Sequence, residues 1–267
     1  MIHVVSFSSG LSSALTAVRV MNRYWKGLTR LVFMDTLFED EDNYRFMSDF
    51  ERRFDVEIIR LAEGRTPYEV SRDESVIPNQ KLAPCTFRLK IQIFKKWLVQ
   101  QEKDTDHITI HIGYDFSEMH RCEATRRNYE ALGYTVDFPL LWQPIEYRPY
   151  KQVCREDWGI EPPRMYEMGY THANCGGRCV KQGQGDWLRT LANFPERYAE
   201  IEKWEAEMRD HPKRKNYALL RSQTNGNTTP LTLKELREKY EGKLLDAPLL
   251  CGLDEQSACV HCGVEDA

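Results

Sequence analysis

Short apolar runs alternate with segments of helical periodicity through the first 160 residues. Runs rich in Val, Ile and Phe, without regularly spaced polar positions, are typical of strands that are covered on both faces. Between them, apolar residues recur at helical spacing, as in Leu11, Leu15 and Val18. Strands that alternate with helices indicate an α/β fold, a mostly parallel sheet with helices on both faces. The predicted strands lie at 2–7, 29–34, 55–60, 107–112 and 134–140.

The pattern changes near residue 160, where a Pro-Pro pair interrupts it. We expect an α/β domain over residues 1–160 and a cysteine-rich, partly helical region over residues 161–267. The polar and apolar positions of this second region predict helices near 184–210 and 231–241 and a polar loop over 222–229.

The composition is that of a folded globular chain, with 41% apolar and 29% charged residues. The net charge of −4 argues against binding nucleic acid over the whole surface, although a local basic groove is compatible with it. No run of about 18 apolar residues is present, and Met1–Val5 has the pattern of a strand rather than of a signal peptide. We therefore expect a cytoplasmic protein with no membrane partner.

The first predicted strand leads into a turn of small residues directly before a helix. Such a turn presents backbone N–H groups at a helix N-terminus, where phosphate binds favourably. The alternative is a helix cap without a ligand, since a serine can cap a helix by itself. The turn lacks the spacing of the dinucleotide fingerprint and the lysine of the P-loop, which disfavours a conventional dehydrogenase or kinase. The candidate phosphate-binding residues are Ser6, Phe7, Ser8, Ser9, Gly10, Ser12 and Ser13.

The second predicted strand ends in Asp35 and Thr36, and an acidic run from Glu39 to Asp42 follows. In open α/β sheets, ligands bind beyond the carboxyl ends of the strands. Asp35 and Thr36 are therefore expected beside the first turn. Glu41 and Asp42 are interpreted instead as the solvated start of a helix, whose dipole they complement.

Further motif-like segments follow in chain order. They are Cys85 to Lys90, Gly113-Tyr114 with Glu118 and Arg121, and Tyr166 to Tyr170 before Cys175 and Cys179. With the first turn and Asp35-Thr36, these segments resemble, in order, motifs of the PP-loop ATP pyrophosphatase superfamily. The similarity is to the branch that contains the phosphoadenosine phosphosulfate (PAPS) reductases and their phage and bacterial relatives. It extends from residue 6 to residue 179, about two-thirds of the chain.

This resemblance implies an adenine nucleotide alpha-hydrolase-like fold over residues 1–160 that binds ATP or PAPS together with Mg²⁺. The first turn would hold the phosphates, with contacts from Asp35, Thr36, Gly113 and Tyr114. The catalytic residues that it implies are Asp35, Lys90 and Arg121.

Two positions depart from the family pattern. Ser9 replaces a glycine, and Ser12 replaces the aspartate of the loop. The second change removes a carboxylate that could help to hold Mg²⁺, so the serine-rich loop is compatible with either binding or cleavage of the nucleotide.

Four of the eight cysteines form two close pairs, Cys175 with Cys179 and Cys259 with Cys262. Four thiolates can hold tetrahedral Zn²⁺ or a [4Fe-4S] cluster. Cys85 is a fifth candidate, since the resemblance gives the cysteine at this position a ligand role, so five thiols compete for four positions. The alternatives are two unrelated reduced pairs and, for Cys85, a buried small residue. Cys122 and Cys154 are predicted to be structural.

The expected function is adenylation of an acceptor with release of pyrophosphate, in sulfur transfer or thiolation assisted by an iron–sulfur cluster. The acceptor would be a nucleic acid or a small molecule, and a sulfur donor protein is a further expected partner. A first alternative is a sulfonucleotide reductase in which Cys251 attacks the bound sulfonucleotide, because Cys251-Gly252-Leu253 resembles the reductase tail. A second is a nucleotide-binding sensor or partner protein whose metal site is structural.

Overall fold

A parallel sheet of five strands forms the centre of the molecule. The computed structural model describes residues 1–101, 107–224 and 227–243. All neighbouring strands of the sheet run parallel, in the spatial order β3-β2-β1-β4-β5. The strands are β1 (Ile2–Phe7), β2 (Thr29–Asp35), β3 (Ile58–Ala62), β4 (Ile108–His111) and β5 (Thr135–Asp137).

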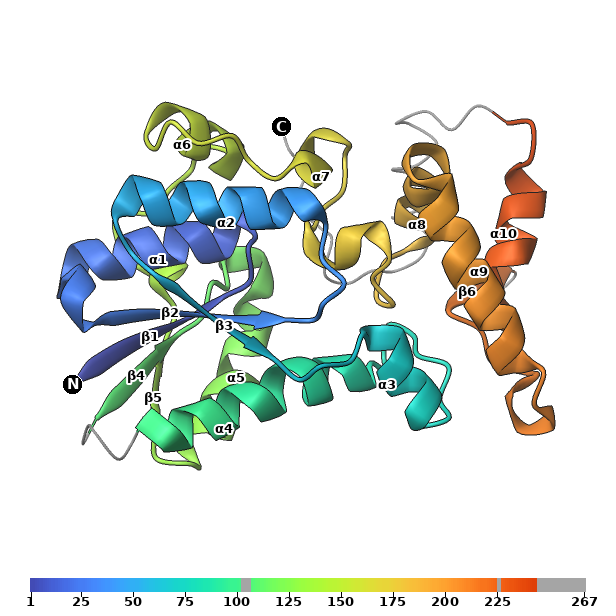
Figure 1. Ribbon diagram of the computed structural model, residues 1–267, viewed down its shortest axis with the longest axis horizontal. Helices are drawn as coiled ribbons and strands as arrows, with labels where there is room; N and C mark the ends of the chain where they lie inside the picture. The colour runs from blue at the N-terminus through green and yellow to red at the C-terminus, as the bar shows by residue number, and fades with distance from the viewer. Residues whose placement is uncertain (102–106, 225–226, 244–267) are drawn as a thin grey trace.

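Helices cover both faces of this sheet, which confirms the predicted fold class. Figure 1 shows α1 (Leu11–Tyr24) and α2 (Glu41–Phe54) on one face, and α4 (Gln92–Gln101) and α5 (Met119–Glu130) on the other. Successive residues of β1 point to opposite faces of the sheet and pack with different helices. Val5 packs with α1 and α2, whereas Val4 packs with α4 and α5.

Two strands differ from their predicted bounds for local reasons. β3 begins later than predicted because α2 continues to Phe54 and Asp55 then ends it in a left-handed conformation, with φ of 50°. β5 ends at Asp137 rather than at residue 140, because Pro139 begins a short 3-10 helix, η4 (Pro139–Leu141). The remaining short helices of this part are η1 (Lys26–Leu28), α3 (Pro67–Asp73), the π-helix η2 (Thr86–Ile91), η3 (Phe116–Glu118) and α6 (Tyr150–Glu156).

The second region is helical, with one β-hairpin. A buried cluster around Trp187 and Tyr198 joins its helices, and Phe38 and Tyr68 of the first region pack into the same cluster. The polar loop predicted over 222–229 is wrong, because residues 222–224 and 227–229 belong to two antiparallel strands, β6 and β7. The boundary at residue 160 stays a prediction. The elements are α7 (Arg164–Glu167), η5 (Asn174–Gly177), α8 (Gln184–Asn193), α9 (Pro195–Arg209), η6 (Pro212–Arg214), β6 (Leu220–Thr224), β7 (Asn227–Leu231) and α10 (Leu233–Tyr240).

No helix among the described residues combines the length and the apolar character that a membrane span requires.

A pair of buried histidines links β1 to β4. Nδ1 of His3 lies 3.0 Å from Nε2 of His111, and the His3 ring stacks on Tyr24 at 3.8 Å between centroids. Burial lowers the pKa of His111 to about 4 and also lowers the pKa of His3, because a charged ring is poorly solvated there. Both rings are therefore neutral in the folded protein at neutral pH.

The lowered pKa of His111 predicts a loss of stability in mild acid. Between pH 6.5 and 4 the unfolded chain binds a proton at this position and the folded chain does not, so the free energy of unfolding falls as the pH falls. We expect His111 to account for about 2 kcal/mol of the stability lost between pH 7 and pH 5. Urea unfolding of the wild type and of His111→Gln at both pH values measures this difference. An equal loss in the two proteins would contradict it.

Candidate functional site

The strand order reverses between β1 and β4, the position at which open α/β sheets form a ligand crevice. The chain passes from β1 to β2 and β3 on one side of β1, and then crosses to β4 on the other side. All of these strands are parallel, so the segments after Phe7, Asp35 and His111 meet at one edge of the sheet. Ligands of open α/β sheets bind at such a reversal of strand order. The predicted first turn and the Gly113 segment flank this position.

The serines of the first turn organise the turn itself. Ser13 Oγ accepts hydrogen bonds from the backbone N–H of Ser8 at 3.0 Å and from the Ser8 hydroxyl at 3.2 Å, and it donates to the Gly10 carbonyl at 2.8 Å. Ser9 is left-handed, with φ of 59°. The N-cap of α1 is Gly10, which has no side chain, so the alternative of a serine N-cap is wrong. A turn braced in this way presents the first N–H groups of α1 without a side-chain oxygen of the N-cap residue over them.

The side chain of Tyr166, in α7, contacts this turn. Its hydroxyl accepts from the backbone N–H of Leu11 at 3.3 Å, and burial raises its pKa, so it stays protonated. A Cβ atom on Gly10 would lie 3.0 Å from this hydroxyl. Ser9 and Gly10 are buried, so this turn is not the exposed loop that its polar sequence suggests. The sequence pattern contains Tyr166 but gives it no role in the site.

The segment after β4 packs directly on the start of α1. A Cβ atom on Gly113 would lie 2.7 Å from Thr16 Oγ1 and 3.0 Å from the Ser12 carbonyl oxygen. Only glycine therefore allows this approach without a shift of the first turn of α1. Two predicted nucleotide-binding segments, 100 residues apart in the chain, are in contact.

Tyr114 and Arg121 form a stacked group beside Gly113. The Tyr114 ring is nearly parallel to that of Phe138, with 5.7 Å between centroids, and the Arg121 guanidinium lies 4.3 Å from the Tyr114 centroid. Arg121 also forms an ion pair with Glu118. The predicted catalytic cation is thus paired with a carboxylate, and a polyanionic ligand would have to compete for it.

Asp35 and Thr36 lie at the end of β2 with different partners. Asp35 accepts from the backbone N–H of Leu37 at 2.8 Å and from the Tyr44 hydroxyl at 2.9 Å. Burial and this carboxylate raise the pKa of Tyr44 well above its usual value, so Tyr44 remains a donor. Thr36 is buried and donates to Glu39 Oε1 at 3.0 Å. Asp35 is therefore oriented toward the edge of the sheet, and Thr36 is tied to the acidic run.

Glu39 and Asp40 are buried, which their position in an acidic run does not suggest. Asp40 caps α2 by accepting from the Asp42 backbone N–H, and it forms ion pairs with Arg164 at 2.8 Å and with Arg197 at 2.7 Å. Burial raises the pKa of Asp40, but the hydrogen bonds from the two arginines outweigh it and the pKa is lowered. α2 begins at Glu41, so the helix-start interpretation of Glu41 and Asp42 is confirmed, but only Glu41 is solvated, because Asp42 pairs with Arg45 and accepts from the Arg164 N–H.

Three predicted cysteine ligands and Lys90 come together beside Glu39. Cys175 donates a hydrogen bond to Cys179, which lowers the pKa of Cys179 to about 7 and raises that of Cys175. Burial raises the pKa of Cys85, and the nearby Cys179 raises it further. Burial opposes a charge on Lys90, yet Glu39 and the three thiols favour it, and its pKa is raised. Lys90 is therefore a cation within a set of thiols, which is the environment that stabilises thiolates.

Among residues 1–101, 107–224 and 227–243, no group of three or more His, Cys, Asp or Glu side chains is arranged to hold a metal ion. Cys175 is buried, while Cys85 and Cys179 are half-buried thiols. Cys259 and Cys262 lie outside the described residues, as does Cys251. The four-thiolate site stays a prediction. Cys122 and Cys154 lie in α5 and α6 as free thiols.

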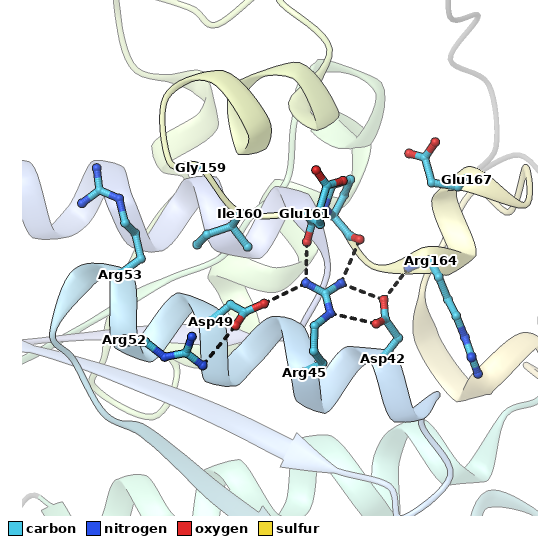
Figure 2. Close-up of a pocket in the computed structure, with 11 residues that line it drawn as sticks. Asp42, Arg45, Asp49, Arg52, Arg53, Gly159, Ile160, Glu161, Arg164 and Glu167 are labelled. Atoms are coloured by element: carbon cyan, nitrogen blue, oxygen red, sulfur yellow. Dashed lines mark hydrogen bonds and ion pairs between the residues drawn. The ribbon is translucent and has the colours of Figure 1, made fainter.

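A separate hollow of about 680 Å³ opens between α2 and residues 159–167 (Figure 2). Arg45 crosses it, bonded to Asp42, to Asp49 and to the carbonyl oxygens of Glu161 and Pro162. The guanidinium of Arg45 is therefore hydrogen-bonded within the protein, and these bonds join α2 to the second region. None of the predicted site residues lines this hollow.

Comparisons with known proteins give distant similarities. No protein-family model matches the chain. Over 217 residues, or 80% of this chain, the sequence is 25% identical to the uncharacterized protein MJ0066 of Methanocaldococcus jannaschii, and it spans 42% of the length of that protein. The phosphate complex of a phosphoadenylyl-sulfate (PAPS) reductase from Candida auris is similar in structure, with a TM-score of 0.43 and 15% identity, over 64% of this chain and 80% of that chain. A function must therefore be argued from the residues of the site.

The paired carboxylates Asp40 and Glu41 provide a stability test of the contact between α2 and the second region. Both pair with Arg164 and Arg197, but the Asp40 side chain is 0% exposed and that of Glu41 is 77% exposed. Asp40→Ala removes the N-cap of α2 and the buried partner of Arg164 and Arg197, which keep only the exposed Glu41, and should cost about 3 kcal/mol of unfolding free energy. Glu41→Ala should cost less than about 1 kcal/mol. Urea unfolding measures both, and similar losses in the two variants would refute the buried role of Asp40.

Proposed function

We propose that this chain binds an adenine nucleotide in the crevice between β1 and β4 and uses it to adenylate an acceptor, with release of pyrophosphate, in sulfur transfer or thiolation. The observation that carries the proposal is the contact of Gly113 with Ser12 and Thr16 at the point where the strand order reverses. This contact joins two of the segments that resemble PP-loop motifs.

The phosphates would lie against the backbone N–H groups at the start of α1, where the helix dipole favours negative charge, and would replace the Tyr166 hydroxyl at the Leu11 N–H. The hydroxyl group of Ser12 is a short donor, and Ser8 would exchange its hydrogen bond to Ser13 for one to a phosphate. Asp35, held by Tyr44 and the Leu37 N–H, is a carboxylate at the same edge that could help to hold Mg²⁺. Since Ser12 replaces the loop aspartate, Asp35 is the residue we assign to this task.

Lys90 and Arg121 would each stabilise negative charge. Lys90, whose pKa is raised by Glu39 and the thiols, remains charged and can stabilise a thiolate or a developing negative charge. Arg121 stacks on Tyr114 at the mouth of the crevice and would exchange Glu118 for a phosphate.

The cysteines beside Lys90 have the chemistry of soft-metal ligands, although the described side chains are not arranged as a metal site. Cys85, Cys175 and Cys179 would hold a [4Fe-4S] cluster or Zn²⁺ with a fourth thiolate from Cys259 or Cys262, since soft metals prefer sulfur ligands. When bound, an iron–sulfur cluster supplies electron or sulfur transfer chemistry. The charge of Lys90 would offset that of the thiolates that a bound metal creates, and Glu39 would hold the Cys175 turn.

A second candidate is a sulfonucleotide reductase. Two features favour it: the loop lacks the aspartate that could help Mg²⁺ in ATP cleavage, and Cys251 lies in a segment that resembles the reductase tail. The solved structure that resembles this chain bears the name of a PAPS reductase. In such a reaction the Cys251 thiolate would attack the sulfur of the bound sulfonucleotide, forming a cysteine–sulfonate and releasing the nucleotide. A thiol reductant would then release sulfite.

One pair of assays separates the two reactions. We expect the wild type to form AMP and pyrophosphate from ATP with Mg²⁺, with water as a slow acceptor, because the leaving group must be neutralised. Cys251→Ala should leave this activity within about twofold, since no covalent intermediate on that thiol is required. The second assay measures sulfite released from PAPS in the presence of dithiothreitol. Sulfite release that is lost in Cys251→Ala, together with no cleavage of ATP, would overturn adenylation in favour of reduction.

A further inference from the structure

One carboxylate joins the predicted nucleotide edge to the cysteine turn. Glu39 Oε1 accepts from the Thr36 hydroxyl at 3.0 Å, and Oε2 accepts from the backbone N–H of Cys175 at 2.7 Å. Asn43 lies 3.4 Å from the same Oε2 and donates to the Ala173 carbonyl at 2.8 Å. Thr36 directly follows β2, whereas Cys175 lies in η5. Glu39 therefore connects these two parts of the site through its two carboxylate oxygens.

The turn that Glu39 holds has an unfavourable backbone. Cys175 has φ of 57° and ψ of 21°, and Gly176 follows with φ of 54° and ψ of 39°. Residues with a side chain rarely adopt this left-handed region, so a tertiary contact must stabilise Cys175 there. The short hydrogen bond from its N–H to a carboxylate is charge-assisted and supplies such a contact. Arg197 adds a second one through the Gly176 carbonyl at 3.0 Å.

The thiols are connected to the same carboxylate through the turn. Cys85 and Cys179 pack against the buried cluster that contains Cys175. A change in the position of Glu39 would therefore move the Cys175 backbone and, with it, the Cys175 thiol relative to the other two. Within this series of hydrogen bonds, the Thr36 hydroxyl lies at the predicted nucleotide edge, directly after β2.

We propose that Glu39 is a positioning residue that couples nucleotide binding at the Thr36 edge to the conformation of the Cys175–Gly177 turn. This inference rests on the proposed function. A nucleotide oxygen that accepts the Thr36 hydroxyl takes one donor from Glu39, which then holds the Cys175 N–H more tightly. By reciprocity, a turn that is fixed by a bound metal or ligand at the thiols would change the affinity for the nucleotide by the same factor.

Hydrogen exchange of the peptide that spans residues 172–180 tests the coupling in the protein as purified. In the wild type, saturating ATP should slow exchange in this peptide at least about threefold. In Glu39→Gln, exchange without ATP should be faster, and the effect of ATP should vanish while ATP still binds. Glu205→Gln is the matched control, because Glu205 is also a buried carboxylate that accepts two backbone N–H groups, those of Leu219 and Leu233, at 2.8 and 2.7 Å. This control should keep the wild-type effect of ATP.

The outcomes separate this inference from the function on which it rests. An equal ATP effect in the wild type and in Glu39→Gln would overturn the coupling role and leave nucleotide binding intact. No binding of ATP to the wild type would overturn the proposed function, and the inference with it. If Glu39→Gln does not fold, Thr36→Val serves as the second variant, since it removes only the hydroxyl from this chain of bonds. The ATP effect should be lost in Thr36→Val and restored in Thr36→Ser, and its persistence in Thr36→Val at saturating ATP would contradict the coupling.

Discussion

Two adjacent buried carboxylates after β2 hold the second region of this protein against the edge of its sheet. Glu39 binds the backbone N–H of Cys175, and Asp40 forms ion pairs with Arg164 and Arg197. A buried charge is tolerated only when it is paired and hydrogen-bonded, so these partners must be in place whenever the chain is folded. The position of the thiols relative to the nucleotide edge follows from this constraint.

The arrangement brings two kinds of chemistry to one end of the molecule. Where the strand order reverses between β1 and β4, a braced turn lies at a helix N-terminus, which suits a phosphate. One carboxylate oxygen of Glu39 bonds to Thr36 at the end of β2, and the other bonds to the turn that carries Cys175. Tyr166 connects the second region to the turn directly, through the Leu11 N–H. An enzyme that activates a substrate with a nucleotide and then transfers sulfur needs both sites at such close quarters.

The sheet was predictable from the sequence because its strands are covered on both faces and read as continuous apolar runs. The meeting of the first turn, Asp35 and the Gly113 segment also follows from strand direction alone, since parallel strands share one carboxyl edge. The β6–β7 hairpin was missed, because most of β7 is exposed and polar and its pattern is that of a loop.

The roles of Glu39, Asp40 and Tyr166 could not be predicted from local sequence. The acidic run has the pattern of a solvated helix start, but only its last two residues, Glu41 and Asp42, belong to α2. The partners that bury Glu39 and Asp40 lie more than 120 residues away, in a region whose packing no local pattern reveals. The length of the acidic run could have indicated this difference. The run begins at Glu39 but α2 begins at Glu41, so the first two carboxylates precede the helix.

The central claim is that a nucleotide binds where Gly113 meets the first turn of α1, and calorimetric titration with ATP and Mg²⁺ tests it most directly. In Gly113→Ala the added methyl group would displace Thr16 and the Ser12 carbonyl, and the affinity for ATP should fall at least about tenfold, which is about 1.4 kcal/mol. Gly133→Ala is the control, because Gly133 is a positive-φ glycine with open space around it, in the turn between α5 and β5. It should bind ATP as the wild type does. Unchanged affinity in a folded Gly113→Ala protein would contradict the account.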